Sequence, residues 1–334
     1  MGEKMKAVQY GCGPIGCSVT ALAARRNNIE LVGAVDIDPE KVGRDLGEVA
    51  GLSETLGITI SDEPESLFAE TQPDLIFHTT GSSFRAVYDQ IAGAVKAGVN
   101  VVSTCEELSF PYNREPQLSS ELDALAKEHG VTVLATGINP GFLMDLWPLC
   151  MTAMCQDVTS VRAVRIQDAT TRRLPFQQKI GAGRTPEEFQ QLIEEGTLRH
   201  VGLPESIEHI AAGLGWKLDD VEETIEPVMA EHQVSSEYLT VEPGQAAGVK
   251  QIGYGRMGGK VVVSGEFQAY LGAPESYDAV YIEGHPNMEV VVKGGTHGDI
   301  GTAAMTVNAA RRVVAAPAGL LTMKDLPVVV WSDS

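Results

Sequence analysis

The sequence predicts an α/β protein with two domains, a doubly wound parallel sheet followed by a second α+β domain built on a mixed sheet. Three observations support this. The chain has 334 residues, more than one compact domain usually contains. Its first half alternates short apolar runs with stretches of helical spacing. Its second half contains consecutive strand-like runs joined by glycine-rich turns.

Residues 1–147 are expected to form the parallel sheet. Helical spacing occurs between the strand-like runs, for example at Val87, Ile91 and Val95. Apolar strands without polar alternation are typical of a sheet covered on both faces. The runs that read as such strands are KAVQY, LVGAVD, DLIFHTT, NVVST and VTVLAT.

Residues 148–300 are expected to form the second domain, and residues 301–334 to pack back on the first domain as a helix and tail. FLMDLWPLCMTAMC predicts a helix leaving the first domain, and VTSVRAVRIQ predicts a strand. TPEEFQQLIEEG and PESIEHIAAGLGW predict acidic amphipathic helices. The further predicted strands are EYLTV, AGVKQIGYGRM, KVVVSGEFQAYLG, YDAVYIEG and NMEVVVKG.

Charge and composition exclude several partners. The formal net charge is −20, which would repel nucleic-acid phosphates and anionic membranes. No signal-peptide pattern or apolar run of about 18 residues occurs, so we expect no membrane association. The cysteines are five in number and lie in apolar contexts, which favours reduced thiols in the cytoplasm. Cys150 and Cys155 lack CxxC spacing, so no metal site is expected.

A glycine-rich turn, GCGPIG, follows the first predicted strand and opens a helix. Gly11 permits the tight turn, Gly13 lets a pyrophosphate approach the backbone, and Gly16 allows close helix–strand packing. Pro14 and Ile15 complete the turn, whose free N–H groups suit a phosphate. This pattern predicts a dinucleotide-binding Rossmann domain.

The second predicted strand ends in Asp36, twenty residues after Gly16. A carboxylate at this spacing binds a ribose 2′-hydroxyl and repels the 2′-phosphate of NADP. Lys41 and Arg44 follow closely and would offset that repulsion. We therefore expect NAD(H) and/or NADP(H) as cofactor.

Ligands of open α/β sheets bind beyond the carboxyl ends of the strands. The FHTTGSS and VVSTCEE strand ends therefore place Thr79, Thr80, Gly81, Thr104 and Cys105 near the cofactor. An alternative role for the first two threonines is capping of the next helix, and the two roles are compatible.

The segments STCEEL, ATGINPGFLMD and GDIGTAAMTVNAA, with the glycine turn, resemble a known family. The chain is similar over nearly its whole length to dihydrodipicolinate reductase-like dehydrogenases, which include 2,4-diaminopentanoate dehydrogenase and NAD(P)H-dependent amine dehydrogenases. The His-His pair and the Lys-x-Asp-x-Pro-Ser-Gly-Thr segment of true dihydrodipicolinate reductases have no counterpart, so a role in lysine biosynthesis is not expected.

The resemblance implies hydride transfer between a nicotinamide and the carbon of a C=N bond. It places the family's active-site glutamate on Glu106 or Glu107, after the strand Val101–Thr104. A carboxylate there would pair with a substrate ammonium and move its protons. Thr104-x-x-Glu107 fits a capping box, which favours Glu106 as the catalytic group.

The resemblance also places Asn139, Pro140, Gly141 and Phe142 between cofactor and substrate. Asn139 is expected to contact both of them. Trp147, at the end of the first domain, is a further candidate, and others come from the second domain, where the segment Arg172–Gly183 is expected to form a loop over the cleft. Core packing is the alternative for Trp147, and a structural role is the alternative for His200. These further substrate-binding candidates are Trp147, Arg165, Gln167, Phe176 and His200.

The leading functional hypothesis is reductive amination of small ketones or aldehydes with ammonia, and the reverse oxidative deamination. One alternative is a 2,4-diaminopentanoate dehydrogenase, whose substrate carboxylate needs a basic anchor such as Arg165, Arg172 or Arg173. Another is a dinucleotide-binding sensor without catalysis, which the acid after the fifth strand argues against. An apolar face around KVVVSGEFQAYLG predicts a homodimer.

Overall fold

The computed structural model describes residues 4–333, which fall into two compact units. Unit 1 contains the chain up to Phe142 and again from His297 onward, and unit 2 runs from Leu143 to Thr296. The boundaries expected from the sequence lay at residues 147 and 300. Residues 143–147 belong to unit 2 because they lead into α6 (Leu146–Thr152), which packs on α9 (Leu203–Gly213) and on the sheet of that unit.

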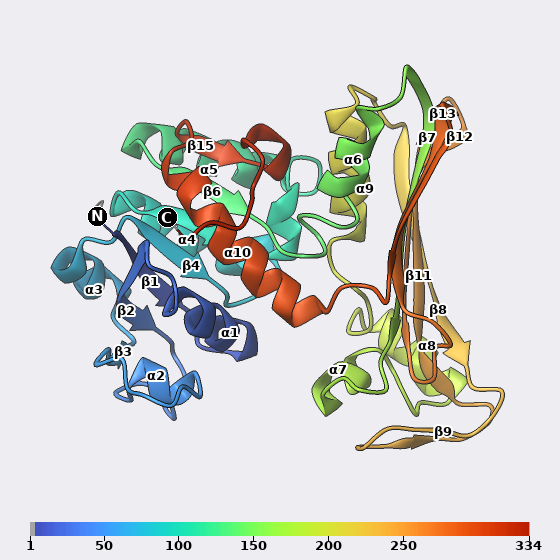
Figure 1. The fold of residues 1–334 in the computed structure, drawn as a ribbon, viewed down its shortest axis with the longest axis horizontal. Coiled ribbons are helices and arrows are strands. Elements are labelled where there is room, and N and C mark those ends of the chain that lie inside the picture. Colours follow the sequence, from blue (N-terminus) through green and yellow to red (C-terminus); the bar gives the residue numbers. More distant parts are fainter. Residues whose placement is uncertain (1–3, 334) are drawn as a thin grey trace. The chain divides into compact units, whose positions relative to one another are not determined.

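Unit 1 is built on a seven-stranded parallel sheet with the strand order β15-β6-β5-β4-β1-β2-β3. The Rossmann-type α/β prediction is confirmed (Figure 1). The first and last strands along the sheet were not predicted separately, since they are only three and two residues long. The strands are β1 (Met5–Tyr10), β2 (Ile29–Val35), β3 (Ile60–Ser61), β4 (Leu75–His78), β5 (Asn100–Ser103), β6 (Thr132–Ala135) and β15 (Gly319–Leu321).

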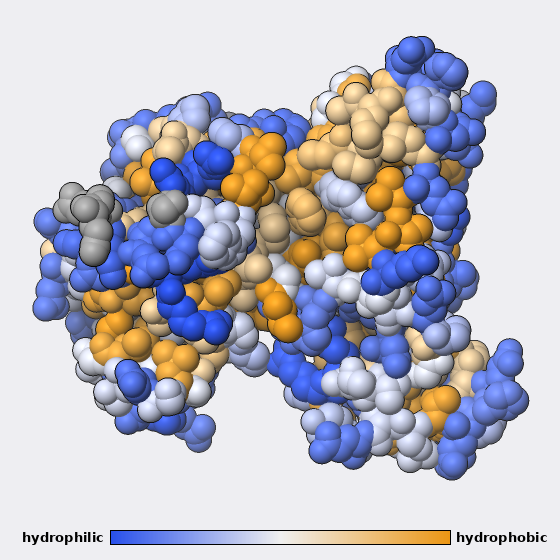
Figure 2. Space-filling view, viewed as in Figure 1, coloured by the Kyte–Doolittle hydropathy of each residue, from blue (hydrophilic) through white to orange (hydrophobic). Residues whose placement is uncertain are grey.

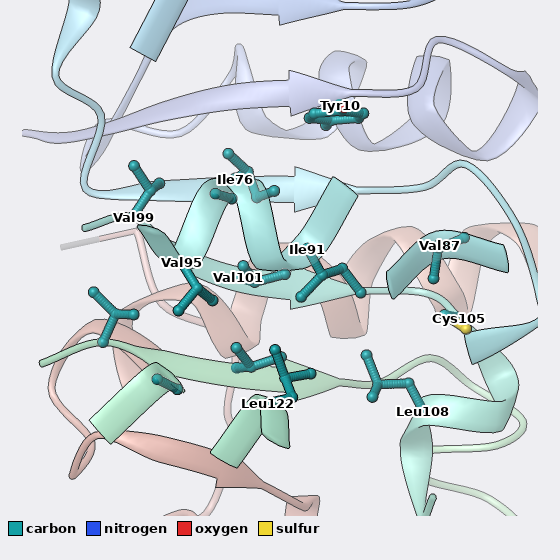
Figure 3. Close-up of a cluster of buried hydrophobic side chains, with 14 of the residues drawn as sticks. Tyr10, Ile76, Val87, Ile91, Val95, Val99, Val101, Cys105, Leu108 and Leu122 are labelled. Carbon is teal, nitrogen blue, oxygen red and sulfur yellow. The ribbon is translucent and has the colours of Figure 1, made fainter. Parts of the chain in front are cut away.

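Helices cover both faces of this sheet. α1 (Pro14–Ala23) and α10 (Gly298–Val314) pack on one face, so the C-terminal helix does return to the first unit. The other face carries the main apolar core, in which Ile76 and Val101 lie beside Ile91 and Val95 (Figure 3). The remaining helices are α2 (Leu46–Val49), α3 (Pro64–Thr71), α4 (Phe84–Lys96), α5 (Pro116–His129) and the short 3₁₀ helices η1 (Glu106–Ser109) and η2 (Met323–Asp325).

Unit 2 contains a six-stranded mixed sheet with the order β14-β13-β7-β12-β11-β8, as predicted for the second domain. β12 and β7 run parallel, and the other neighbours are antiparallel. Helices α6 and α9 lie on one face of this sheet (Figure 1). The strands are β7 (Asp157–Asp168), β8 (Asp220–Met229), β11 (Ala246–Met257), β12 (Lys260–Tyr270), β13 (Tyr277–His285) and β14 (Met288–Lys293), with a small separate pair β9 (Val234–Ser235) and β10 (Thr240–Val241).

Three segments of unit 2 differ from the expectation. Of the predicted strand EYLTV only β10 is a strand, and it pairs with β9 outside the six-stranded sheet. The edge strand β8 was not predicted. Its sequence DVEETIEPVM is acidic and contains a proline, and both features are uncommon in strands that can be recognised from sequence. The segment after Arg172, expected as a loop, contains the helix α7 (Leu174–Lys179) with Pro175 in its first turn. A proline is well tolerated there because its missing N–H would have no partner within the helix.

Polar residues occupy much of the face of the molecule that Figure 2 shows. In Figure 2 the outer rim of each unit is mainly hydrophilic, as the net charge of −20 leads one to expect. None of the helices within residues 4–333 is long and apolar enough to cross a membrane.

Candidate functional site

The glycine turn between β1 and α1 has the geometry that a dinucleotide needs. Gly11 has a φ of +93°, and a Cβ there would lie 2.8 Å from Thr80 Cγ2. A Cβ on Gly16 would collide with the carbonyl oxygen of Gly11, whereas a Cβ on Gly13 would meet no atom within 4 Å. Gly16 thus allows close packing, and the space beside Gly13 at the start of α1 is open to a phosphate.

Asp36, directly after β2, is fixed against the glycine turn. Its Oδ2 accepts a hydrogen bond from the Cys12 N–H at 2.7 Å, and its Oδ1 accepts one from the Asp38 N–H at 2.9 Å. Lys41 lies 3.5 Å from Asp36 and 3.1 Å from Asp38. The Arg44 guanidinium instead points to the Glu40 carbonyl at 3.5 Å. The structure therefore brings Asp36 and Lys41 together, whereas Arg44 donates to the backbone of Glu40.

Thr79 ties the end of β4 to the glycine turn. Its hydroxyl donates to the Gly11 carbonyl at 2.7 Å and accepts from the side-chain amide of Gln9 at 2.9 Å. Gln9 also donates to the Gly11 carbonyl at 2.8 Å. Gln9 is fully buried in β1, and sequence analysis missed it because a single glutamine in an apolar strand carries no motif. The suggested capping of α4 by Thr79 or Thr80 does not occur, since Ser83 holds the N-cap position.

Thr80 belongs to a second network, centred on the buried His78. The His78 Nδ1 lies 2.9 Å from Ser103 Oγ, and its Nε2 lies 2.9 Å from both Gln90 Oε1 and Thr80 Oγ1. Ser103 Oγ also accepts from the Cys105 N–H at 3.0 Å. Burial lowers the His78 pKa to about 4, so the ring is neutral. His78 therefore couples the ends of β4 and β5, a role not predicted from the sequence.

The two glutamates after β5 have different surroundings. Glu107 Oε2 accepts from the Phe84 N–H at 2.9 Å, at the N-terminus of α4, and its Oε1 lies 3.6 Å from Arg114. The expected capping box between Thr104 and Glu107 is therefore wrong: Cys105 is the N-cap of η1, without a side-chain cap. Glu107 caps a different helix, one that only the folded chain brings beside it.

Glu106 lines a small cavity of about 30 Å³ within unit 1. The cavity gathers residues from the ends of β5 and β6 and from α10. Thr302 of α10 also accepts a hydrogen bond from the Ile138 N–H at 3.3 Å. Thr136, Gly137, Ser109 and Thr302 were not predicted. The lining residues are Thr104, Cys105, Glu106, Ser109, Thr136, Gly137, Asn139, Pro140 and Thr302.

The segment after β6 is shaped by glycine. Gly141 has a φ of +119°, and a Cβ there would collide with the Gly137 backbone nitrogen. Asn139 and Pro140 lie on this tight segment and line the cavity, and the partly buried Phe142 ends unit 1. Trp147 is partly buried on α6 in unit 2.

Unit 2 contains a cluster of buried charged and polar side chains, among them Arg165, Gln167 and Arg172. Arg165, 2% exposed, lies 2.8 Å from Asp278 and donates to the Thr296 carbonyl at 2.6 Å. Gln167 donates to the same carbonyl at 2.9 Å, and Arg172 donates to Gln167 Oε1 at 3.3 Å.

Phe176 completes this cluster, because the Arg172 guanidinium lies 4.1 Å from the centre of its ring. Burial lowers the Arg165 pKa, as does the charge of Arg172, while Asp278 opposes both effects. Burial raises the Asp278 pKa, because it disfavours the charged form of a carboxyl group as it does that of a guanidinium. Asp278 thus pairs with Arg165, and the Arg172 guanidinium lies against Gln167 and Phe176 in the same cluster.

His200 lies near this cluster. Its backbone N–H donates to Gln251 Oε1 at 2.7 Å, and its ring centre lies 4.3 Å from that of Phe267. Burial lowers the His200 pKa to about 3, and the charges of Lys179 and Arg165 act in the same direction. A neutral imidazole is therefore expected at this position.

Comparison with known proteins identifies the family. A family model described as the 2,4-diaminopentanoate dehydrogenase C-terminal domain matches residues 142–332, and one described as dihydrodipicolinate reductase, N-terminus, matches residues 5–133. A 2,4-diaminopentanoate dehydrogenase from Acetoanaerobium sticklandii is 34% identical over 98% of this chain and 94% of its own length. The chain belongs to the 2,4-diaminopentanoate dehydrogenase family.

Two amine dehydrogenases are also similar to this family member. The enzyme from Streptomyces virginiae is 23% identical over 97% of this chain and 96% of its own. The structure of an amine dehydrogenase from Mycobacterium smegmatis superposes with a TM-score of 0.86 at 25% identity, covering 98% of both chains. The predicted resemblance, and with it the class of dehydrogenase acting on CH–NH₂ groups, is confirmed.

Proposed function

We propose that this protein is an NAD(P)H-dependent amine dehydrogenase that reductively aminates a small carbonyl compound with ammonia and catalyses the reverse deamination. The main support for this proposal is that Glu106 lines a polar cavity in the same unit as the glycine turn and Asp36. An acid in this position is suited to move the protons that imine formation requires. The names of the relatives support the same chemistry.

The residues of unit 1 fit a nicotinamide dinucleotide. Open space beside Gly13 would accept the pyrophosphate at the start of α1, and Asp36 would accept a ribose hydroxyl. When bound, the dinucleotide supplies or takes up the hydride. Lys41 is already paired with Asp36 and Asp38, so it offsets the repulsion of a 2′-phosphate only in part. We therefore propose NAD(H) as the preferred cofactor and NADP(H) as a weaker one.

Glu106 is assigned the proton transfers, and Glu107 a structural role. Glu106 would stabilise a cationic iminium and shuttle protons to and from the nitrogen. Glu107 is held by the Phe84 N–H and by Arg114, so its carboxylate is already engaged at the start of α4. The sequence analysis also favoured Glu106 as the catalytic group, although the helix that Glu107 caps is α4 and not the one it predicted.

The direct test is NAD(P)H oxidation with a panel of short ketones and aldehydes, with and without ammonium. The expected result is ammonium-dependent oxidation together with mass-spectrometric detection of the amine. Cofactor binding without turnover on any carbonyl compound or amine would instead support the non-catalytic sensor.

A second candidate substrate class, a diamino acid, is favoured by the cluster of unit 2. Arg165 and Arg172 are both buried in this cluster, and a guanidinium binds a carboxylate with two parallel hydrogen bonds. We expect 2,4-diaminopentanoate to outcompete 2-aminopentane, and Arg172→Gln to raise the KM for the diamino acid only. Equal use of both amines, before and after the substitution, would favour the simple-amine reading.

We further propose a homodimer formed through the face of the unit 2 sheet opposite α9. Gly253 and Gly265 lie against Leu203 of α9, so Ile252 and Tyr254 point to the other face. Register places Tyr281 beside Arg162 on this same face, which also carries Ile166 and Tyr277. An aromatic and aliphatic sheet face of this kind suits a self-complementary interface.

We place the protein in the cytoplasm on the basis of its cysteines. All five are free thiols, and disulfides are rare in reducing compartments.

A further inference from the structure

We propose that the cavity beside Glu106 is the pocket that holds ammonia, with the Thr136 hydroxyl as one of its ligands. This inference rests on the proposed function, since it locates the nitrogen co-substrate of that reaction. The cavity lies wholly within unit 1 and has a volume of about 30 Å³. One water-sized molecule needs roughly 10–15 Å³. By this measure the cavity accepts two or three such molecules, and it is too small for the carbonyl substrate.

Thr136 is the first residue after β6, and its backbone N–H donates to the Ser103 carbonyl at 2.8 Å. The side chain is 3% exposed, and its Oγ1 has no hydrogen-bond partner among residues 4–333. A buried hydroxyl left unpaired costs about 1–3 kcal/mol. Because Thr136 lines the cavity, a small polar molecule there would satisfy it.

Two glycines keep this hydroxyl accessible. A Cβ on Gly141 would lie 2.8 Å from Thr136 Oγ1, and a Cβ on Gly137 would lie 3.1 Å from the Pro140 carbonyl oxygen and 3.5 Å from Thr302 Oγ1. A side chain at either position would therefore crowd the polar groups of the cavity. The sequence leaves this space open with glycine at both places.

The lining offers what ammonia requires, namely acceptors for its N–H groups and a donor for its lone pair. A Glu106 carboxylate accepts hydrogen bonds, and the Thr136 hydroxyl both accepts and donates. Thr302 Oγ1 accepts from the Ile138 N–H and still has a hydrogen to donate. Ammonium must lose a proton before its nitrogen can attack. Glu106 lines the cavity, and its carboxylate can act as the base that takes this proton.

The nitrogen lone pair forms a bond to the carbonyl carbon while the C=O π pair moves to oxygen; nitrogen then loses a proton and oxygen gains one, which gives a carbinolamine. Protonation of the hydroxyl and loss of water give the iminium, whose carbon would take up the hydride that bound NADH supplies. In total, one carbonyl compound, one ammonium, one NADH and one proton give one alkylammonium, one NAD⁺ and one water.

The test is a kinetic comparison of Thr136→Val with Thr20→Val. The first removes the hydroxyl and keeps the shape, so the KM for ammonia should rise about tenfold, the loss of roughly one hydrogen bond. The KM values for the ketone and for NADH should change by no more than about twofold. Thr20 is a matched control, because it is fully buried in α1 and its hydroxyl also has no partner among the described residues. Its variant should keep all three constants.

A second variant, Thr136→Ser, keeps the hydroxyl and enlarges the cavity by one methyl group. It should gain activity with methylamine relative to ammonia, and this arm remains informative if Thr136→Val does not fold. An active wild-type enzyme whose ammonia KM is the same in Thr136→Val and Thr20→Val, with no gain of methylamine use, would show that the cavity holds only ordered water. No ammonium-dependent turnover in the wild type would overturn the proposed function itself.

Discussion

At the scale of single residues, adjacent glutamates with the same chemistry have different surroundings. Replacing Glu106 by Gln keeps the shape but removes the charge and the basicity, so turnover should fall by roughly 10²-fold or more. NADH affinity, measured by fluorescence titration, should not change. Glu107→Gln is the matched control: it should retain turnover and lose on the order of 1–2 kcal/mol of stability, because a charged acceptor for the Phe84 N–H is lost. The opposite pattern would transfer the catalytic role to Glu107.

Asp36 is the second residue whose role can be tested individually. Its carboxylate accepts from the Cys12 N–H and would repel a 2′-phosphate. Asp36→Ala should therefore lower kcat/KM for NADH relative to NADPH. The measurement is the ratio of the two values in variant and wild type, and an unchanged ratio would rule out Asp36 as the ribose ligand. Asp38→Ala, which removes the other carboxylate near Lys41, separates the loss of that pairing from the loss of the ribose acceptor.

At the scale of elements, the buried His78 joins β4 to β5 and should make stability depend on pH. Its folded pKa of about 4 lies below the ordinary 6.5, so the unfolded chain binds the proton first as the pH falls. The stabilisation that the neutral His78 gives the folded state is complete above about pH 6.5 and is lost as the pH falls towards 4. Between pH 7 and pH 5 the free energy of unfolding should fall by about 2 kcal/mol from this cause.

Denaturant unfolding at both pH values tests this linkage. His78→Gln should show a smaller loss of stability between pH 7 and pH 5 than the wild type. His129→Gln, at the exposed end of α5, serves as the control and should keep the wild-type loss. Equal losses in all three proteins would mean that His78 does not carry the pH dependence.

At the scale of the whole molecule, the prediction concerns assembly. Light scattering should report twice the chain mass of 35.6 kDa at micromolar concentration. Ile252→Arg places a charge on the sheet face opposite α9 and should give monomers. Val328→Arg, at a position 74% exposed in unit 1, should leave the dimer intact. A wild-type monomer, or dissociation by the control substitution alone, would exclude this interface.

The sequence by itself determined those features that depend on neighbouring residues. Apolar runs and helical spacing indicated the parallel sheet, and the GCGPIG turn with Asp36 indicated the dinucleotide site, because both patterns are local to a strand and the turn that follows it. The catalytic role of the acid after β5 was inferred from the family resemblance, and it stays a prediction. The acidic strand β8 was missed, since pairing with β11 rather than its own composition makes it a strand.

Only the tertiary structure decided how the local pieces divide their roles. Glu107 fits a capping box with Thr104 in sequence, but the folded chain offers it the N-terminus of α4, 23 residues earlier. Thr302 reaches the cavity beside Glu106 because α10 returns to unit 1 after the whole of unit 2. The unpaired hydroxyl of Thr136 is visible only when its surroundings are known. Contacts between residues far apart in the chain leave no periodic pattern, so no reading of neighbouring residues could have supplied them.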